Sequence, residues 1–546
     1  MQEDNPVEPP PLIVRDKEGI ATITEAGHEL LSNCVTDTRG QVYAFFESVP
    51  SDVAGSAMAR LAKCGDDVRV ILLNEFASSL PRWKPTRNFG KELPFLRKII
   101  TDYGDDSVQQ LASFSVVVMG ASNILTKILE RGRLGAYLEQ STRFIFFDKM
   151  IIIGYNADGS PIFAYRFYVP EELVGQSRDD YIAEMNKLFQ NYSAVVHELH
   201  LKLMAASSEP EEKRDLAWRN AVRGQACDSA RFLLPAATTS TVGLHGSAQF
   251  FDSLIMHMLS HELAEARRVG SDMLRELRKI APVFFERTEM PERGAATSLY
   301  LRETKDNFKK VCNRICKPHE SQKTAVVLSD YHPTNQSQLI RSLPFISGLV
   351  APDNLTDEQE SELLNAYSGT RMNRRHRLGR MIEKAYYTFC MRTGYAEFRD
   401  LQRHRLVSAL EWLALRGGDD YDVPAPIVLH GLETKFRESF KQSSLTEEWL
   451  HYDNGPLVAQ YATLFGHKMD WTWTVNLREL MHIVELRTQP AGHPAYRKLC
   501  QQMYEAVEAV HPKLAATISF INKGEDPELT RLAAERAVAF KQSKLQ

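Results

Sequence analysis

Apolar residues recur at helical spacing along most of the chain. Segments such as DDYIAEMNKLFQNYSAVVHELHLKLM (179–204) and LTRLAAERAVAF (529–540) place them at i, i+3, i+4 and i+7, which predicts amphipathic helices. Strand signals are few. The clearest are RFIFFDKMIIIG (143–154) and PIFAYRFYV (161–169), which flank the turn sequence YNADGS and predict a β-hairpin. The pattern indicates an α+β protein that is mainly helical, with a small β element.

A diverged internal repeat divides the chain into two halves. FSVVVMGASNILTKILERGRL (114–134) matches YTFCMRTGYAEFRDLQRHRL (387–406), and residues 229–258 match residues 457–486. In each half we expect a helix, an Arg-x-Arg segment, further helices, a Gly-containing loop and a helix that carries Met-His. The predicted organisation is a disordered tail at 1–15, a first domain at 16–290, a helical linker at 291–325 and a second domain at 326–546.

Composition narrows the class of protein. The net charge of −4 gives no electrostatic reason for bulk binding to nucleic acid or membranes. No apolar run reaches the roughly 18–20 residues that span a bilayer, and the acidic, Pro-rich start is unlike a signal peptide, so we expect a soluble cytoplasmic protein. The seven cysteines form no Cys-x-x-Cys pair and fit reduced core thiols, and no metal site is predicted.

Three segments carry a more specific pattern: RGRLGAYLEQSTRF (131–144), RHRLVS (403–408) and TVNLRELMHIVELR (474–487). Together they resemble the flavin-dependent thymidylate synthases, whose signature Arg-His-Arg-x-x-Ser-x-x-Glu-x-Ser-x-Arg is followed by Ala-Arg-x-x-Leu-Pro and Asn-x-Arg-x-Leu-x-x-Phe-x-x-x-Arg. The resemblance covers about 90–290 and 370–510 and implies two fused copies. Since family members are homotetramers with active sites where subunits meet, it also implies a pseudo-dimer in each chain and a homodimer of chains, a pseudo-tetramer.

The first copy keeps the residues that grip the nucleotide in the family. A phosphate monoester is well held by planar Arg forks, while hydroxyl and carboxylate groups orient the sugar and base. The resemblance assigns this nucleotide-binding role to Glu139, Ser141, Arg143 and Arg231. The second copy keeps Glu411 but has Leu413, Leu415 and Gln460 at the other three positions.

The second copy keeps the flavin-facing residues that the first has lost. The resemblance makes Arg403 and Arg487 catalytic residues that lie between nucleotide and flavin, where fixed cations stabilise charge developing on the uracil ring. It assigns cofactor binding to His404, Arg405, Asn476, Arg478 and, from its shared helix face with Arg478, His482. Ser408 is also kept. The first copy has Gly132, Ser247, Gln249 and Met258 at the positions that match His404, Asn476, Arg478 and Arg487.

These complementary losses predict one site divided between the copies. The implied reaction is reductive methylation of dUMP, or of a related pyrimidine nucleotide, at carbon 5, with FAD as cofactor and with methylenetetrahydrofolate and NADPH as co-substrates. The alternative is a non-catalytic nucleotide-binding or scaffold protein that retains the fold.

The motif RMNRRHRLGRMIE (371–383) has two interpretations. It binds the flavin pyrophosphate or an anionic folate tail, or it is an exposed basic loop. Nucleic-acid binding would rest on this motif alone. The acceptor nucleotide, the carbon donor and the placement of the site within or between chains stay open.

Overall fold

The computed structural model describes residues 10–17, 19–61, 64–84, 92–104, 106–155 and 161–544. The chain forms two compact units that are not consecutive in sequence. The first unit contains residues 1–186 and 236–318, and the second contains residues 187–235 and 319–546. Residues 187–235, which precede the last strand of the first copy, therefore belong to the second unit. Of the predicted tail, residues 1–9 lie outside the described residues, and Ile13–Arg15 forms β1.

A four-stranded antiparallel sheet organises the first unit, in the order β3-β4-β8-β5. Its buried face packs on a core that includes Tyr43, Met58, Leu61 and Leu72. The elements of this unit are β1 Ile13–Arg15, β2 Ala21–Ile23, α1 Glu25–Leu31, β3 Val42–Ala44, α2 Ser51–Leu61, α3 Val68–Glu75, α4 Glu92–Arg97, β4 Ser113–Ser122, α5 Asn123–Leu129, β5 Ala136–Glu139, β6 Ile151–Tyr155, β7 Pro161–Ala164, the start of α6 Gly175–Ala206, β8 Thr239–Ser247, α8 Ala248–Leu259, α9 Ala264–Ile280 and α10 Gly294–Ile315.

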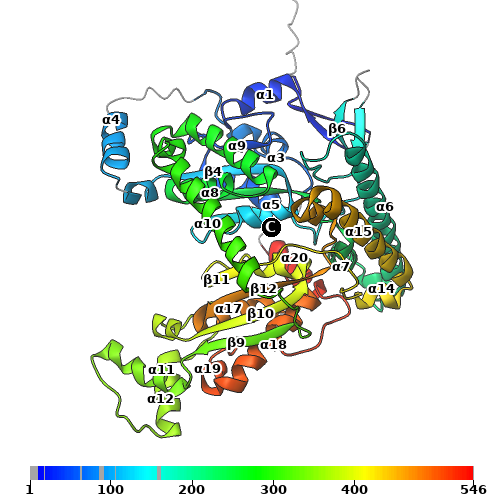
Figure 1. The fold of residues 1–546 in the computed structure, drawn as a ribbon. Coiled ribbons are helices and arrows are strands. Elements are labelled where there is room, and N and C mark those ends of the chain that lie inside the picture. Colours follow the sequence, from blue (N-terminus) through cyan, green and yellow to red (C-terminus); the bar gives the residue numbers. More distant parts are fainter. Residues whose placement is uncertain are drawn as a thin grey trace, which may run out of the picture. The chain divides into compact units, whose positions relative to one another are not determined.

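The second unit repeats this sheet, in the equivalent order β9-β10-β12-β11 (Figure 1). Trp471 and Trp473 of β12 are buried in its core, which identifies them as packing residues. The elements of this unit are the end of α6, α7 Leu216–Ala230, β9 Val326–His332, α11 Gln336–Ser342, α12 Asp357–Ser368, β10 Tyr386–Gly394, α13 Tyr395–Leu401, β11 Val407–Trp412, α14 Ala425–Leu429, α15 Glu433–Asn454, α16 Pro456–Ala459, β12 Lys468–Asn476, α17 Leu477–Arg487, α18 Pro494–Val510, α19 Pro512–Ala516 and α20 Leu532–Ser543.

The two sheets place matching residues at matching points of the fold. Ser247 and Asn476 each end a strand and cap the helix that follows, accepting a hydrogen bond from the backbone N–H of the third helical residue. α9 and α18 have 17 residues each and follow these helices in the same order. The fold therefore supports the register in which Arg131 matches Arg403 and Met258 matches Arg487.

Two expectations about secondary structure need correction. The segment 114–134 is not one helix but strand β4 followed by the short helix α5, because the β-branched run Val116–Val118 favours a pleated, half-buried strand. The Gly-containing loop expected before the Met-His helix is strand β8, and β12 in the second copy. The β content therefore exceeds the small element that was predicted. The hairpin β6–β7 is confirmed, and its turn at 156–160 lies outside the described residues.

Candidate functional site

Three arginines from separate segments meet at Asp400, in the last turn of α13 in the second unit. An Nη atom of Arg231 lies 2.9 Å from Asp400 Oδ2, and Arg403 donates to Asp400 Oδ1 at 3.2 Å. Arg487 donates to the backbone carbonyl of Asp400 at 2.7 Å. Three cations around one carboxylate leave a net positive charge, which suits an anionic ligand. We call Asp400 and these three arginines the Asp400 cluster.

Arg231 belongs to the second unit although its sequence belongs to the first copy. It opens a short 3₁₀ turn after α7, and this turn is held by backbone hydrogen bonds from Phe465 to Leu234 and from Gly466 to Phe232. The Arg231 side chain is only 1% exposed, yet its Nε and one Nη have no hydrogen-bond partner among the described residues. A buried donor without an acceptor is costly, so these two groups favour a further acceptor.

His404 is the second residue that holds Arg487. Its Nε2 accepts a hydrogen bond from Arg487 Nε at 2.9 Å, so the ring proton is on Nδ1, which lies 3.4 Å from Glu479 Oε1. Burial, followed by Arg487, His482 and Arg403, holds the pKa of His404 well below its ordinary value, and the ring is neutral. The His482 ring lies edge-on at 5.7 Å between ring centroids.

Glu479 is a buried carboxyl next to several cations. Burial raises its pKa to about 7, against the opposing effect of Arg377, Arg405 and Arg478. Folding therefore favours the protonated form. The stabilising contribution is complete below pH 4.5, the ordinary pKa, and is lost as the pH rises through about 7.

Glu479→Gln should therefore flatten the pH dependence of stability. In the unmodified protein, we expect the titration of this group to lower the free energy of unfolding by up to about 3 kcal/mol when the pH is raised from 5 to 8. Urea denaturation at both pH values measures the difference. Glu535→Gln, in the exposed last helix, is the control and should keep the original slope. An identical slope in the Glu479 variant would show that folding does not change the pKa of this carboxyl.

The remaining cofactor-side residues border the same region. Asn476 caps α17 through its Oδ1, which accepts from Glu479 N–H at 2.9 Å. Arg478 is anchored, because it donates to the Leu378 carbonyl at 2.9 Å and to Glu383 at 3.3 Å. Arg405 and Ser408 are exposed.

The arginine-rich motif 371–383 divides into two kinds of residue. Arg371 is structural, since it forms a bidentate pair with Glu485, with both distances 2.6 Å. In the part of the chain that is described, the side chains of Arg374, Arg377 and Arg405 have no hydrogen-bond or ion-pair partner. Burial is the largest cause that lowers the pKa of His482. The nearby charges of Arg377 and then of Arg374 lower it further. Unpaired cations therefore border the side of α17 that carries His482.

The first copy replaces this polar network with apolar packing. A Cβ atom at Gly132, which matches His404, would lie 2.6 Å from the ring of Phe250, which matches Glu479. The contact between His404 and Glu479 has thus become a contact between glycine and an aromatic ring. Ile128 and Met258 likewise stand where Asp400 and Arg487 stand in the second copy. A pocket of about 510 Å³ beside Gly132 and Phe250 remains, with Arg131, Gln249 and His257 also in its wall.

Gly132→His should destabilise the protein by about 2 kcal/mol, the cost of forcing extra atoms into a packed site. Gly132→His combined with Phe250→Ala should recover part of that loss, because the ring that obstructs the new side chain is removed. The midpoint of urea denaturation measures both. Gly55→His is the control, since no atom lies within 4 Å of a Cβ there. Equal midpoints for the three variants and the original chain would mean that Phe250 does not fill this place.

The predicted nucleotide loop of the first copy lies at the end of β5. Glu139 is buried and accepts from Lys127 Nζ at 3.0 Å, and Lys127 also pairs with Glu130. Ser141 Oγ accepts from the backbone N–H of Arg143 at 3.2 Å, and the Arg143 side chain is half-buried. These residues are in the first unit, whereas Arg231 is in the second.

The matching loop of the second copy keeps Glu411 but has leucines at the serine and arginine positions. Leu413 is exposed, and Leu415 is buried, with its backbone N–H donating to Gln460 Oε1 at 3.1 Å. Gln460 matches Arg231 and accepts a backbone hydrogen bond in place of offering a cation. The serine and the two arginines predicted to bind the nucleotide in the first copy are therefore absent at the matching positions.

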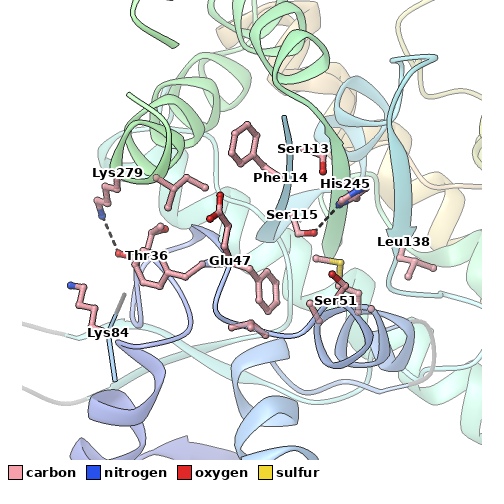
Figure 2. Close-up of a pocket in the computed structure, with 17 residues that line it drawn as sticks. Thr36, Glu47, Ser51, Lys84, Ser113, Phe114, Ser115, Leu138, His245 and Lys279 are labelled. Atoms are coloured by element: carbon pink, nitrogen blue, oxygen red, sulfur yellow. Dashed lines mark hydrogen bonds between the residues drawn. The ribbon is translucent and has the colours of Figure 1, made fainter. Parts of the chain in front are cut away.

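A cavity of about 880 Å³ in the first unit lies on the other face of β5, lined by Leu138 (Figure 2). Ser115 Oγ and His245 Nδ1 are hydrogen-bonded at 2.9 Å across the neighbouring strands β4 and β8. Sequence reasoning did not identify this pair. His245 has no carboxylate partner within the described ranges, so the pair lacks the third group that would orient a catalytic imidazole. We interpret it as a cross-strand contact.

Two further features are absent from the described residues. No helix there is sufficiently long and apolar to cross a bilayer. No group of three or more His, Cys, Asp or Glu side chains there is arranged to hold a metal ion.

Comparison with known proteins agrees with the geometry. The family model described as thymidylate synthase complementing protein matches residues 68–283 and again residues 330–513. The chain belongs to this family. The two matches also establish the tandem, since each covers one copy of the thymidylate synthase complementing domain.

Two full-length relatives carry names without an activity. "UPF0159 protein Ta1429" of Thermoplasma acidophilum is 28% identical over 520 residues, 88% of this chain and 97% of its own length. A "UPF0159 protein" of Chlamydia muridarum is 26% identical over 95% of this chain and 98% of its own. "Flavin-dependent thymidylate synthase" of Clostridium tetani is 22% identical over 191 residues, 34% of this chain and 67% of its own. This chain thus shares similarity with a protein named as a flavin-dependent thymidylate synthase.

Proposed function

We propose that this tandem member of the thymidylate synthase complementing family is a flavin-dependent methyltransferase. It would methylate dUMP, or a related pyrimidine nucleotide, at carbon 5, with methylenetetrahydrofolate as carbon donor and NADPH as reductant. The observation that carries the proposal is the Asp400 cluster, in which Arg231, Arg403 and Arg487 are retained together and share one carboxylate. In a scaffold protein, three neighbouring arginines would only lower stability, because their charges repel one another.

The residues present fit an anionic flavin such as FAD. The support is the set of unpartnered cations at Arg374, Arg377 and Arg405, beside the half-buried His482. A diphosphate would supply the acceptors that these side chains lack. When bound, the flavin would carry the hydride chemistry. Arg478 would position the arginine-rich motif by holding Leu378, and Asn476 would present its amide at the start of α17.

The chain's own groups would act on the nucleotide through charge. Arg403 and Arg487 would stabilise negative charge on the pyrimidine ring, because both are fixed by Asp400 before the ligand arrives. His404 would act as a positioning residue, since its neutral ring accepts from Arg487 and keeps that guanidinium oriented. Glu139, Ser141 and Arg143 would bind the nucleotide in the first copy, with Lys127 holding Glu139 in place.

Assembly of the copies is a further part of the proposal. The two copies in a chain would form a pseudo-dimer and two chains a homodimer with twofold symmetry, the common closed arrangement. Light scattering at micromolar concentration tests it, and a monomer would contradict it.

Arg143→Ala should weaken dUMP binding by about 1.5–3 kcal/mol, the range for a hydrogen bond to a charged group. Leu415→Ala, at the matching position of the second copy, should leave binding unchanged. Titration calorimetry on folded protein measures both. Equal losses in the two variants, or none in either, would refute the assignment of the nucleotide to the first copy.

The competing proposal is a nucleotide-binding scaffold that has lost catalysis. It would bind dUMP through the loop of Glu139, Ser141 and Arg143 but would purify without flavin and fail to take it up. Visible absorbance of the purified protein, followed by an assay for methylated nucleotide, separates the two proposals.

A further inference from the structure

A cavity of about 460 Å³ in the second unit lies where β10, α13 and α18 meet. We call it the α18 cavity. Its wall includes Gly394, Glu397, Lys323, Lys498 and Gln502. None of the predicted flavin or nucleotide residues lines it.

The same place in the first copy is closed by a satisfied polar network. Ser122 donates its backbone N–H and its hydroxyl to the two carboxylate oxygens of Glu265, at 2.9 and 2.6 Å. Arg268, one turn along α9, pairs with Glu171 at 2.6 Å and lies 3.7 Å from Asp272. Every charged group there has a partner.

In the second copy each member of that network has changed. The equal lengths of α9 and α18, and of α5 and α13, support the register of the two copies. So do the elements before them, since α9 and α18 follow the matching helices α8 and α17, and α5 and α13 follow the matching strands β4 and β10. The matching residues are Gly394 for Ser122, Ala495 for Glu265, Lys498 for Arg268 and Gln502 for Asp272. All four line the α18 cavity, so their smaller or uncharged side chains open it.

The second copy has also gained a carboxyl at this point. Glu397 stands where the first copy has Leu125, is 6% exposed, and its Oε2 has no hydrogen-bond partner among the described residues. A Cβ atom on Gly394 would lie 2.4 Å from that oxygen, so glycine is required to leave the carboxyl its space. Burial raises the pKa of Glu397 to about 7. A buried acceptor without a partner is costly unless a ligand supplies a donor.

The wall of the cavity carries charges of both signs, and two of its cations are unpaired. Lys323 and Lys498 are exposed, and neither has an ion-pair partner within the described ranges. Arg392, also in the wall, pairs with Asp420 at 2.7 Å and Asp470 at 2.6 Å, and Lys468 pairs with Asp422 at 3.1 Å. The two lysines are therefore the groups that can neutralise an anionic ligand.

We propose that the α18 cavity binds a small anion whose ring presents adjacent N–H donors, the edge that guanine nucleotides and pterins share. A carboxylate accepts two parallel hydrogen bonds from such an edge, and lysines at the rim neutralise a phosphate or carboxylate. The volume lies within the range of small-molecule sites. Glu397 lies near the Asp400 cluster, since Arg231 and Asp400 both affect its pKa, but the proposal does not rest on methyl transfer.

Calorimetric titration of the full chain with GMP, pterin-6-carboxylate and AMP tests the proposal. We expect GMP or the pterin to bind at least tenfold more tightly than AMP, whose base lacks adjacent ring N–H and amino donors, and the tighter of the two identifies the source. Equal affinity for AMP, or no heat with any probe at 1 mM, would overturn it.

Three variants locate the site. Glu397→Gln and Lys498→Ala should each weaken binding at least tenfold, and Lys541→Ala in the exposed α20 should not. Gly394→Ser, Glu397→Leu and Ala495→Glu combined restore the residues of the first copy at these three positions and should abolish binding while the circular dichroism spectrum stays unchanged. Full binding in that folded triple variant would refute the assignment to this cavity.

Discussion

Asp400→Ala should destabilise the protein by about 3–5 kcal/mol, the cost of leaving a buried charge without its partner. The carboxyl is 6% exposed and is the ion-pair partner of Arg231, which is 1% exposed. Removing it takes away the one ion-pair partner that the guanidinium of Arg231 has among the described residues. Urea denaturation measures the loss.

Two further variants make this expectation specific. Asp419→Ala removes an exposed carboxylate nearby in sequence and should change the unfolding free energy by less than about 0.5 kcal/mol. Asp400→Ala combined with Arg231→Met removes both charges and should be more stable than Asp400→Ala alone, because no unpaired charge remains. If the double variant is no more stable than the single one, Arg231 does not depend on Asp400.

Arg377→Ala combined with Arg405→Ala should weaken flavin binding by more than a hundredfold, since each removes a charge-assisted hydrogen bond worth about 1.5–3 kcal/mol. Both side chains are exposed and have no hydrogen-bond or ion-pair partner among the described residues, so at pH 5, where Glu479 is protonated, the protein should unfold at a nearly unchanged urea concentration. Quenching of FAD fluorescence on titration with protein measures the affinity.

The matched control for this pair lies in the same motif. Arg380 is 84% exposed on its side chain and already pairs with Glu383 at 3.4 Å, so Arg380→Ala should change flavin affinity less than threefold. A similar loss in the control would mean that general positive charge, and not the free arginines next to His482, attracts the flavin.

The sequence predicted the repeat and the register of its motifs, because long motifs such as Arg-x-Arg and Asn-x-Arg keep their order even when single residues change. It did not predict that β4 and β10 are strands. The run Val116–Val118 is as apolar as a buried helix, and an apolar run alone cannot distinguish the two. Pairing with β8 and β3 decides between them, and that pairing is distant in sequence.

The sequence predicted the residues of the candidate site that belong to motifs. It did not predict the residues that packing brings to the site. Arg403, His404 and Arg487 stand in motifs, and the structure brings them together. Asp400 was missed because a single acid three residues before a motif has no distinguishing pattern. Comparison of the copies could have identified it, because the first copy has Ile128 in place of Asp400 and Met258 in place of Arg487. The acid and the cation were thus lost together. The placement of Arg231 with the second copy depends on chain packing beyond any local pattern.

We propose that the second copy alone keeps a flavin site, while Phe250 fills the matching place in the first. The most direct test is the amount of FAD released on denaturation, divided by protein concentration, after reconstitution with excess cofactor and removal of free flavin. We expect one flavin per chain. Two per chain would show that the first copy still binds the cofactor, and none would contradict the proposed enzyme.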